Sequence, residues 1–114
     1  MNDKILMLLT ESRKLNGDVI TLTRILIIAL LAYFIDGLQY RELKSALNIS
    51  DGKLISNLRK LEKFEYIRRE EVTIDSKKLD VYYITENGLK EFKKIIRWMN
   101  LITNLVKIDE ERFR

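Results

Sequence analysis

Apolar residues along this chain recur mostly with helical spacing, and in one segment they alternate with polar residues instead. Recurrence every three or four positions is typical of helices that bury one face. Residues 66–84 depart from it, because apolar and polar positions there alternate as in a β-hairpin. The pattern predicts four helices, a hairpin and a final helix, which is a mainly α fold with a small β-hairpin (α+β) in a single domain over residues 1–114.

Residues that cap helices or form turns mark the expected boundaries of these elements. A turn at 16–18 ends the first helix, Thr21 or Thr23 caps the second, and Asp36-Gly37 ends it. The expected ranges are 3–15 for the first helix, 40–64 for a helix-turn-helix, 66–84 for the hairpin with a basic tip at 75–78, and 86–107 for the last helix. This order of elements is that of a winged helix-turn-helix, with the hairpin as the wing.

The most apolar stretch, residues 25–35, has the sequence ILIIALLAYFI. It is shorter than the ~20 residues that a membrane-spanning helix needs. It also lacks the N-terminal position and the cleavage site of a signal peptide. We therefore expect a helix that is buried nearly all round at the centre of the fold, and a cytoplasmic protein that does not bind membranes.

The second helix of the helix-turn-helix, residues 51–63, combines a buried edge with a basic outer edge. Ser50 can cap it, and Leu54, Leu58 and Leu61 form one narrow stripe. The residues about half a turn away from this stripe are small or basic: Gly52, Ser56, Arg59, Lys60 and Lys63. Such a helix has the shape that enters the DNA major groove. A solvated amphipathic helix would share the pattern, but the hairpin that follows favours DNA binding.

Charge and residue usage narrow the function further. The formal charge is +4 with a pI near 9.3, and residues 38–78 hold ten Lys/Arg against seven Asp/Glu, whereas 1–37 are neutral. The absence of His and Cys excludes imidazole and thiol catalysis, disulfides and Cys/His metal sites. The carboxylates between 62 and 71 form no paired motif and are interpreted as solvated charge. We expect no enzyme activity, no cofactor and no bound metal.

Two spaced motifs carry a resemblance to a known family. The first runs from Ser50-Asp51-Gly52 through Leu54 and Leu58-Arg59-Lys60-Leu61-Glu62 to Tyr66, and the second joins Tyr83-Ile84-Thr85 to Gly88 and Phe92. On these motifs, residues 43–92 resemble the small archaeal and bacterial winged-helix transcriptional regulators of the MarR/ArsR-like group. The chain departs from the family at Glu65, where a glycine usually ends the recognition helix. A non-glycine residue there either accepts about 1 kcal/mol of strain or leaves the helix at another angle.

The resemblance implies sequence-specific binding to double-stranded DNA in transcriptional regulation. The recognition helix 51–63 would lie in the major groove, and the wing tip 75–78 on the adjacent minor groove or backbone. Carried over residue by residue, the DNA-binding candidates are Ser50, Lys53, Ser56, Asn57, Arg59, Lys60, Lys63, Lys77 and Lys78. Asp51 is expected to cap the helix, and Asn57 could equally form a hydrogen bond within the domain. Related regulators also allow a small-molecule effector, which no residue here identifies.

The two terminal helices carry more apolar residues than a single domain needs. From Ile95 onward the last helix is apolar almost all round, so one face can cover its own domain and another a partner helix. A homodimer is expected, because each copy alone makes few phosphate contacts. The interface candidates are Leu8, Leu9, Trp98, Met99, Leu101, Ile102 and Leu105. Trp98 is the strongest of them; the alternative is that these faces only close the core of a monomer.

Two other functions fit the same order of elements. A winged-helix protein–protein interaction module would need an apolar or acidic outer face on 51–63, which Ser56, Arg59 and Lys60 do not provide. A non-specific architectural chromatin protein would bind DNA in a salt-dependent way without sequence preference. The abundance of Lys, Glu and Ile, with a single Gln and no Cys, also hints at a thermophilic, archaeal-like source.

Overall fold

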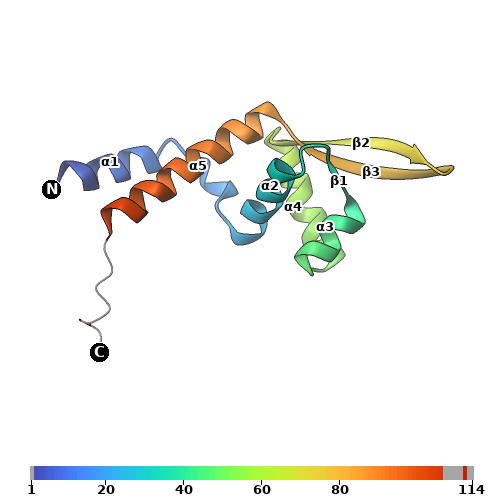
Figure 1. Ribbon diagram of the computed structural model, residues 1–114, viewed down its shortest axis with the longest axis horizontal. Helices are drawn as coiled ribbons and strands as arrows, with labels where there is room; N and C mark the ends of the chain where they lie inside the picture. Colours follow the sequence, from blue (N-terminus) through green and yellow to red (C-terminus); the bar gives the residue numbers. More distant parts are fainter. Residues whose placement is uncertain (1, 107–111, 113–114) are drawn as a thin grey trace.

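The computed structural model describes residues 2–106 and Arg112, and the chain divides into a lobe and an arm (Figure 1). The arm pairs α1 (Asp3–Ser12) with the second half of α5 (Glu86–Leu105). The lobe holds the short 3₁₀ helix η1 (Gly17–Val19), α2 (Leu22–Tyr33), β1 (Leu38–Gln39), α3 (Tyr40–Leu47), α4 (Asp51–Lys63), β2 (Ile67–Ile74) and β3 (Lys77–Ile84). The predicted class, a mainly α fold with a small β-hairpin, is confirmed.

The ends of the two arm helices differ in part from the prediction. α1 stops at Ser12 and not at residue 15, because the backbone turns over 13–15 and Leu15 packs against the core. α5 begins at Glu86 as predicted and is helical to Leu105. Position 107, where the predicted helix ends, lies outside the described residues.

The core of the lobe joins α2 to the predicted leucine stripe of α4. The side chains at its centre are at most 1% exposed: Ile27, Ile28, Leu31, Leu54, Leu58 and Leu61. Burying each of them stabilises the fold by roughly 1.5–3 kcal/mol relative to exposure. Because the stripe occupies one narrow edge of α4, the opposite edge of that helix is left on the surface.

The prediction that the apolar helix α2 is buried nearly all round is wrong for one side. Leu22, Leu26 and Tyr33 are 76%, 41% and 81% exposed, because α3, α4, β3 and α5 all pack against the buried side. The helix also ends at Tyr33, short of the predicted Asp36-Gly37, and Gly37 adopts a φ of 93° in the turn that follows. Among the described residues, none of the helices combines the length and apolar character required to cross a membrane.

A third strand extends the predicted hairpin into a small sheet. β1 pairs antiparallel with β3, placing Leu38 opposite Tyr82 and Gln39 opposite Val81, so the strand order is β1-β3-β2. No strand was predicted at Leu38. Two residues are too few to show the alternation by which a strand is recognised, so this pairing depends on β3 lying beside them.

The tip of the wing is shorter than the predicted 75–78. Asp75 and Ser76 form the whole turn, with φ values of 51° and 66°, and both positive values are typical of a type I′ hairpin turn. Lys77 and Lys78 already belong to β3, where Lys77 pairs with Ile74. The two lysines therefore sit on a paired strand beside the turn, where the sheet restricts their backbone.

The C-terminus of α4 resolves the question that Glu65 raised. Glu65 has a φ of 61°, which is the left-handed conformation that glycine adopts most easily. Its N–H donates to the carbonyl of Glu62 at 2.9 Å, and the N–H of Tyr66 donates to the carbonyl of Leu61 at 3.1 Å. These two bonds form a Schellman motif, so the helix ends in the glycine-type geometry and the glutamate bears the strain.

The start of α5 is locked to the end of α4. Thr85 caps α5 by accepting the N–H of Gly88 at 3.0 Å, and its own hydroxyl donates to the carbonyl of Glu65 at 2.6 Å. The N–H of Thr85 donates to the carbonyl of Tyr66 at 3.1 Å. Thr85 therefore both caps α5 and anchors the arm directly behind α4.

Candidate nucleic-acid interface

The outer edge of α4 forms a shallow groove on the surface of the lobe. Ser50 caps the helix as predicted, its hydroxyl oxygen accepting the N–H of Lys53 at 3.2 Å. The groove has a volume of about 520 Å³ and is lined by Gly52, Ile55, Ser56, Arg59, Lys60 and Lys63. Apart from Ile55, which is 37% exposed, these are the small and basic residues predicted for this edge. The structure thus brings them together on one open surface.

The cations of α4 are not neutralised by the protein. Within residues 2–106 and Arg112, none of Lys53, Arg59, Lys60 and Lys63 makes an ion pair. Lys60 lies over the ring of Phe64, with Nζ 5.5 Å from the centroid, a contact that does not neutralise its charge. Their charges are therefore available to an anionic partner.

Most of the cations of the wing already have a carboxylate partner. Three pairs form on the strands, Arg68 with Glu70 at 2.6 Å, Arg69 with Asp80 at 3.8 Å and Lys78 with Glu71 at 3.8 Å. All six side chains are well exposed, so each pair contributes only about 0–1 kcal/mol to stability. In the described part of the wing, Lys77 is the cation without an ion pair. The two wing lysines that were predicted together therefore differ, because within the described residues Lys78 is paired with a carboxylate and Lys77 is not.

Asn57 is held by Arg24, which lies outside the predicted DNA-binding residues. Its side-chain oxygen accepts the Nε–H of Arg24 at 2.9 Å, and its side-chain nitrogen donates to the carbonyl of Lys53 at 2.8 Å. Arg24 also donates through Nη1 to the carbonyl of Asp18. The hydrogen bond within the domain, which the sequence left open for Asn57, is the one present. Arg24 belongs to α2, and no local pattern could have paired it with α4.

Asp51 does not cap α4, contrary to expectation. Its carboxylate accepts the hydroxyl of Tyr40 at 2.6 Å and the ammonium of Lys44 at 2.9 Å, so it ties α4 to α3. The hydrogen bond to Asp51, with a smaller part from burial, raises the pKa of Tyr40 to about 12. The same bond, and then the one from Lys44, lower the pKa of Asp51. This contact fixes the angle between the two helices of the helix-turn-helix.

A cleft that the sequence did not predict separates α4 from the sheet. Its volume is about 490 Å³, and it is lined by Tyr40, Ile55, Leu58, Arg59, Glu62, Arg69, Asp80 and Tyr82. Two guanidinium groups and two carboxylates line it, so its charges balance. In the part of the chain that the structure describes, no three potential Asp or Glu ligands gather into a metal site.

The candidates for a dimer interface lie on the arm, but their side chains are not equally exposed. Trp98 is half-buried and donates its indole N–H to the carbonyl of Leu8 at 3.1 Å, so it packs α5 against α1 of the same chain. Leu9 and Met99 are 41% and 39% exposed. Leu101, Ile102 and Leu105 are half-buried, as is Leu8. Exposed apolar residues that the prediction missed extend the same surface: Leu6, Met7, Ile96 and Val106.

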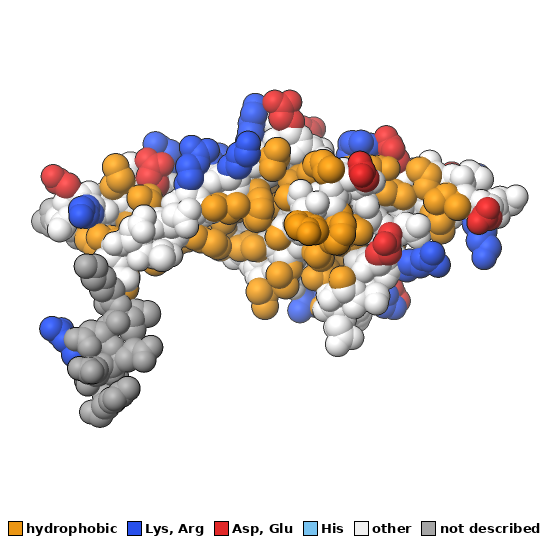
Figure 2. Space-filling model, viewed as in Figure 1, with side chains coloured by type: hydrophobic (Ala, Val, Ile, Leu, Met, Phe, Trp, Pro, Cys, Tyr) orange, Lys and Arg blue, Asp and Glu red, His pale blue; other side chains and the backbone are white. Residues whose placement is uncertain are grey.

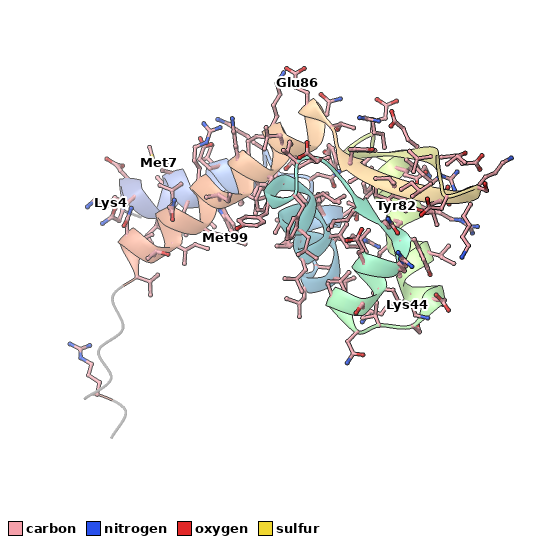
Figure 3. All side chains as sticks on the ribbon, turned by 45° about the vertical axis from the view of Figure 1, so that its right-hand side comes forward. Lys4, Met7, Lys44, Tyr82, Glu86 and Met99 are labelled. Carbon is pink, nitrogen blue, oxygen red and sulfur yellow. The ribbon has the colours of Figure 1, made fainter. Side chains whose placement is uncertain are left out.

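The figures place this apolar surface along the arm. Apolar side chains run along the arm and continue onto the lobe over α2 (Figure 2). Met7 of α1 and Met99 of α5 both project from the arm (Figure 3). At the end of the arm, Lys4, Met7, Leu101, Asn104 and Leu105 line a largely apolar hollow of about 240 Å³. The arm therefore offers unpartnered apolar surface on both of its helices.

A helix-turn-helix (α3 and α4) followed at once by a two-stranded wing defines the class of winged helix-turn-helix proteins. A family model described as "Winged helix DNA-binding domain" matches residues 23–103. The chain belongs to this family, and the resemblance inferred from residues 43–92 is confirmed. No curated protein matches the chain.

Solved structures of transcriptional regulators share the fold. The transcriptional regulator homologue protein from Pyrococcus horikoshii OT3 is 17% identical, with a TM-score of 0.76 over 94% of this chain and 100% of that one. Transcriptional regulator Tm0710 from Thermotoga maritima is 21% identical, with a TM-score of 0.63 over 97% and 81%. A point mutant of S. aureus MepR, bound to an oligodeoxyribonucleotide, is 20% identical, with a TM-score of 0.61 over 98% and 88%. At these identities the likeness concerns the fold alone.

Proposed function

We propose that this protein is a transcriptional regulator that binds double-stranded DNA as a homodimer, with α4 in the major groove. The observation that carries the proposal is the groove on α4: within the described residues its three cations, Arg59, Lys60 and Lys63, have no ion pair, while three of the four wing cations do. Unpaired Lys and Arg on an open helix edge can replace the counterions of phosphates. The MepR mutant with the same fold was solved with an oligodeoxyribonucleotide, which supports the same kind of partner here.

The position of each residue along α4 would decide whether it contacts a base edge or a phosphate. Ser56 and Arg59 lie at the middle of the groove, where side chains reach base edges. Lys53 is beside the capped start of the helix, where free amides and the helix dipole favour a phosphate. Lys60 and Lys63, near the other end, suit phosphates as well. Asn57 orients its neighbours through Arg24 and Lys53 in preference to reading a base.

The wing would contact the DNA beside the helix through its turn. Among the described residues Lys77 has no ion pair to lose, and it is the stronger candidate for a backbone or minor-groove contact. Lys78 would first have to leave Glu71, but that exposed pair is weak, with 3.8 Å between Nζ and Oε1. We expect Lys77 to contribute more to affinity than Lys78.

The arm would join two copies. Leu9 and Met99 lie on its surface together with the exposed Leu6 and Met7, and a second arm could cover all four. Exposed apolar side chains gathered on one part of a protein can mark an interaction site. A two-fold dimer would double the number of phosphate contacts, which matters because each lobe offers only a handful.

A mobility-shift experiment with a random-sequence duplex pool at two salt concentrations tests the proposal. Wild type is compared with Arg59→Ala/Lys60→Ala and with Lys93→Ala/Arg97→Ala, which removes the same two charges from exposed positions of α5. We expect salt-sensitive binding in wild type and the α5 variant, and its loss in the α4 variant. Selection of a palindromic sequence would support a dimeric operator binder.

The other outcomes identify the alternatives. Binding that is salt-sensitive but enriches no sequence would indicate an architectural DNA-binding protein. Equal loss in both double variants would mean that net charge, and not the α4 groove, attracts the DNA. No binding at low salt would overturn DNA binding and favour a protein partner for the same helix and wing.

A further inference from the structure

Glu91 is a charged residue buried at the junction of the arm and the lobe. Its side chain is only 4% exposed, and among the described residues it stands alone as a buried charged side chain. It lies on α5 between Gly88, which touches the end of α4, and Ile95, which is 1% exposed in the core. Beyond Ile95 the helix leaves the lobe and pairs with α1.

The carboxylate of Glu91 joins three segments of the chain. Oε2 accepts the backbone N–H of Asn16 in the loop after α1 at 3.1 Å. Oε1 accepts the hydroxyl of Tyr66, in the turn between α4 and β2, at 3.4 Å, and lies 3.1 Å from the ammonium of Lys94. The side-chain amide of Asn16 donates to the hydroxyl of Tyr66 at 3.2 Å and closes the cluster. We call these four residues, Asn16, Tyr66, Glu91 and Lys94, the joint.

The polar groups of the joint are better suited to fixing the angle between α5 and the end of α4 than to stabilising the fold. A buried carboxylate pays a desolvation cost that apolar side chains of similar size avoid, so charge is a poor means of stabilising a contact. Hydrogen bonds, however, depend on direction as well as on distance, whereas apolar contacts are non-directional. Bonds from Glu91 to both Tyr66 and Asn16 therefore restrict rotation of α5 against the end of α4.

We propose that Glu91 is a positioning residue that sets the angle between the arm and the recognition helix, and with it the half-site spacing of the DNA. The second part rests on the proposed function, because it requires two copies joined through their arms. From Glu91 to Leu105 α5 extends ~21 Å at ~1.5 Å per residue. A rotation of about 10° at the joint would move the end of this lever by about 4 Å. Successive base pairs are ~3.4 Å apart, so a small change of angle alters the spacing by about one base pair.

Distances between two spin labels on one chain test the angle directly. The sequence has no Cys, so Ser56→Cys on α4 and Asn104→Cys near the end of α5 supply the two labelling positions without competition. Labelled chains are diluted with excess unlabelled protein, so that distances within one copy dominate in a monomer or a dimer. The test variants are Glu91→Gln, which keeps the size and loses one acceptor, and Tyr66→Phe, which removes only the hydroxyl.

The matched control is Glu86→Gln at the start of α5, where the side chain points into solvent and, among the described residues, forms its ion pair with Lys90 (Figure 3). We expect one narrow distance in wild type and control, and a distribution shifted or broadened by about 4 Å in both joint variants. An unchanged distribution in folded Tyr66→Phe would overturn the proposal, even if Glu91→Gln failed to fold.

The DNA half of the proposal has its own measurement. Duplexes selected by wild type are shortened and lengthened by single base pairs between half-sites, and their affinities are compared. We expect wild type and Glu86→Gln to prefer one spacing and Tyr66→Phe to lose that preference while remaining a dimer. If Tyr66→Phe kept the preference, the link to spacing would be wrong. If wild type were monomeric or bound no DNA, the proposed function would fail, and the label distances would still decide the role of Glu91.

Discussion

A β-carbon on Gly88 would overlap the backbone carbonyl oxygen of Tyr66. The first turn of α5 therefore touches the backbone of Tyr66, three residues after the end of α4. Thr85 completes this contact by donating its N–H to the same carbonyl at 3.1 Å. The lobe and the arm meet where no side chain fits, so the sequence at this point is restricted by backbone geometry.

The contact predicts that Gly88→Ala is strongly destabilising. The methyl group must push α5 away from Tyr66. Because displacing backbone atoms is costly, we expect a loss of about 2–3 kcal/mol or more in the free energy of unfolding. Urea denaturation measures it. The control is Gly52→Ala on α4, where nothing lies within 4 Å of the new β-carbon and the helix gains up to about 1 kcal/mol. Equal effects at both sites would contradict the contact.

The strained backbone at Glu65 predicts that glycine at this position stabilises the protein. Its φ of 61° strains any residue with a β-carbon, and glycine removes that strain at some cost in chain entropy, so Glu65→Gly should gain about 0.5–1 kcal/mol. Thermal unfolding would show a higher Tm. Glu65→Ala removes the charge but keeps the strain and should leave Tm almost unchanged. If alanine stabilised as much as glycine, charge and not backbone strain would be the cause.

Tyr40 predicts a loss of stability at high pH. Its folded pKa of about 12 lies above the usual 10.0, so its contribution is complete below pH 10 and is lost as pH rises toward 12. Asp51 has a lowered pKa, so its contribution is present above its usual 3.8 and is lost as pH falls. Urea denaturation between pH 9 and about 11.5 should show a smaller decline in Tyr40→Phe than in wild type. Tyr33→Phe, which alters a residue 81% exposed, should decline as wild type does.

The exposure of the arm predicts which substitutions separate dimer from monomer. Met99→Glu should dissociate the dimer without unfolding the chain, because this residue is 39% exposed. Trp98→Ala should instead lower Tm, since it removes packing and a hydrogen bond between α5 and Leu8. Light scattering during size-exclusion chromatography gives the mass. The control is Leu22→Glu on α2, where the side chain is 76% exposed, and this variant should stay dimeric. A monomeric Leu22→Glu variant would indicate that the interface lies on the lobe.

The hydrogen bond from Arg24 to Asn57 predicts that replacing Arg24 changes which DNA sequence is preferred without changing the salt dependence of binding. Arg24→Met keeps much of the packing but releases Asn57, whose amide then becomes free to turn toward a base. We expect a different selected DNA sequence with the same dependence of affinity on salt. The salt dependence would instead weaken by about one unit in slope if Arg24 itself neutralised a phosphate.

Local patterns account for most of the elements and few of the contacts. The leucine stripe and the Ser50 cap predicted α4 with the bounds Asp51–Lys63, because both depend on residues within one or two turns. The exposed side of α2 and the strand β1 escaped prediction. An apolar helix shows what can be buried, but whether Tyr33 has a covering element depends on the packing of the whole chain.

The sequence by itself determined the order of elements, the basic edge of α4 and the apolar surplus of the arm, since periodicity and composition are properties of neighbouring residues. Only the tertiary structure decided the partners. Arg24 reaches Asn57 across 33 positions, Tyr40 reaches Asp51 across 11, and Tyr66 reaches Glu91 across 25. A hydrogen bond requires two groups to meet at a given distance and direction, and for residues so far apart the fold alone supplies both.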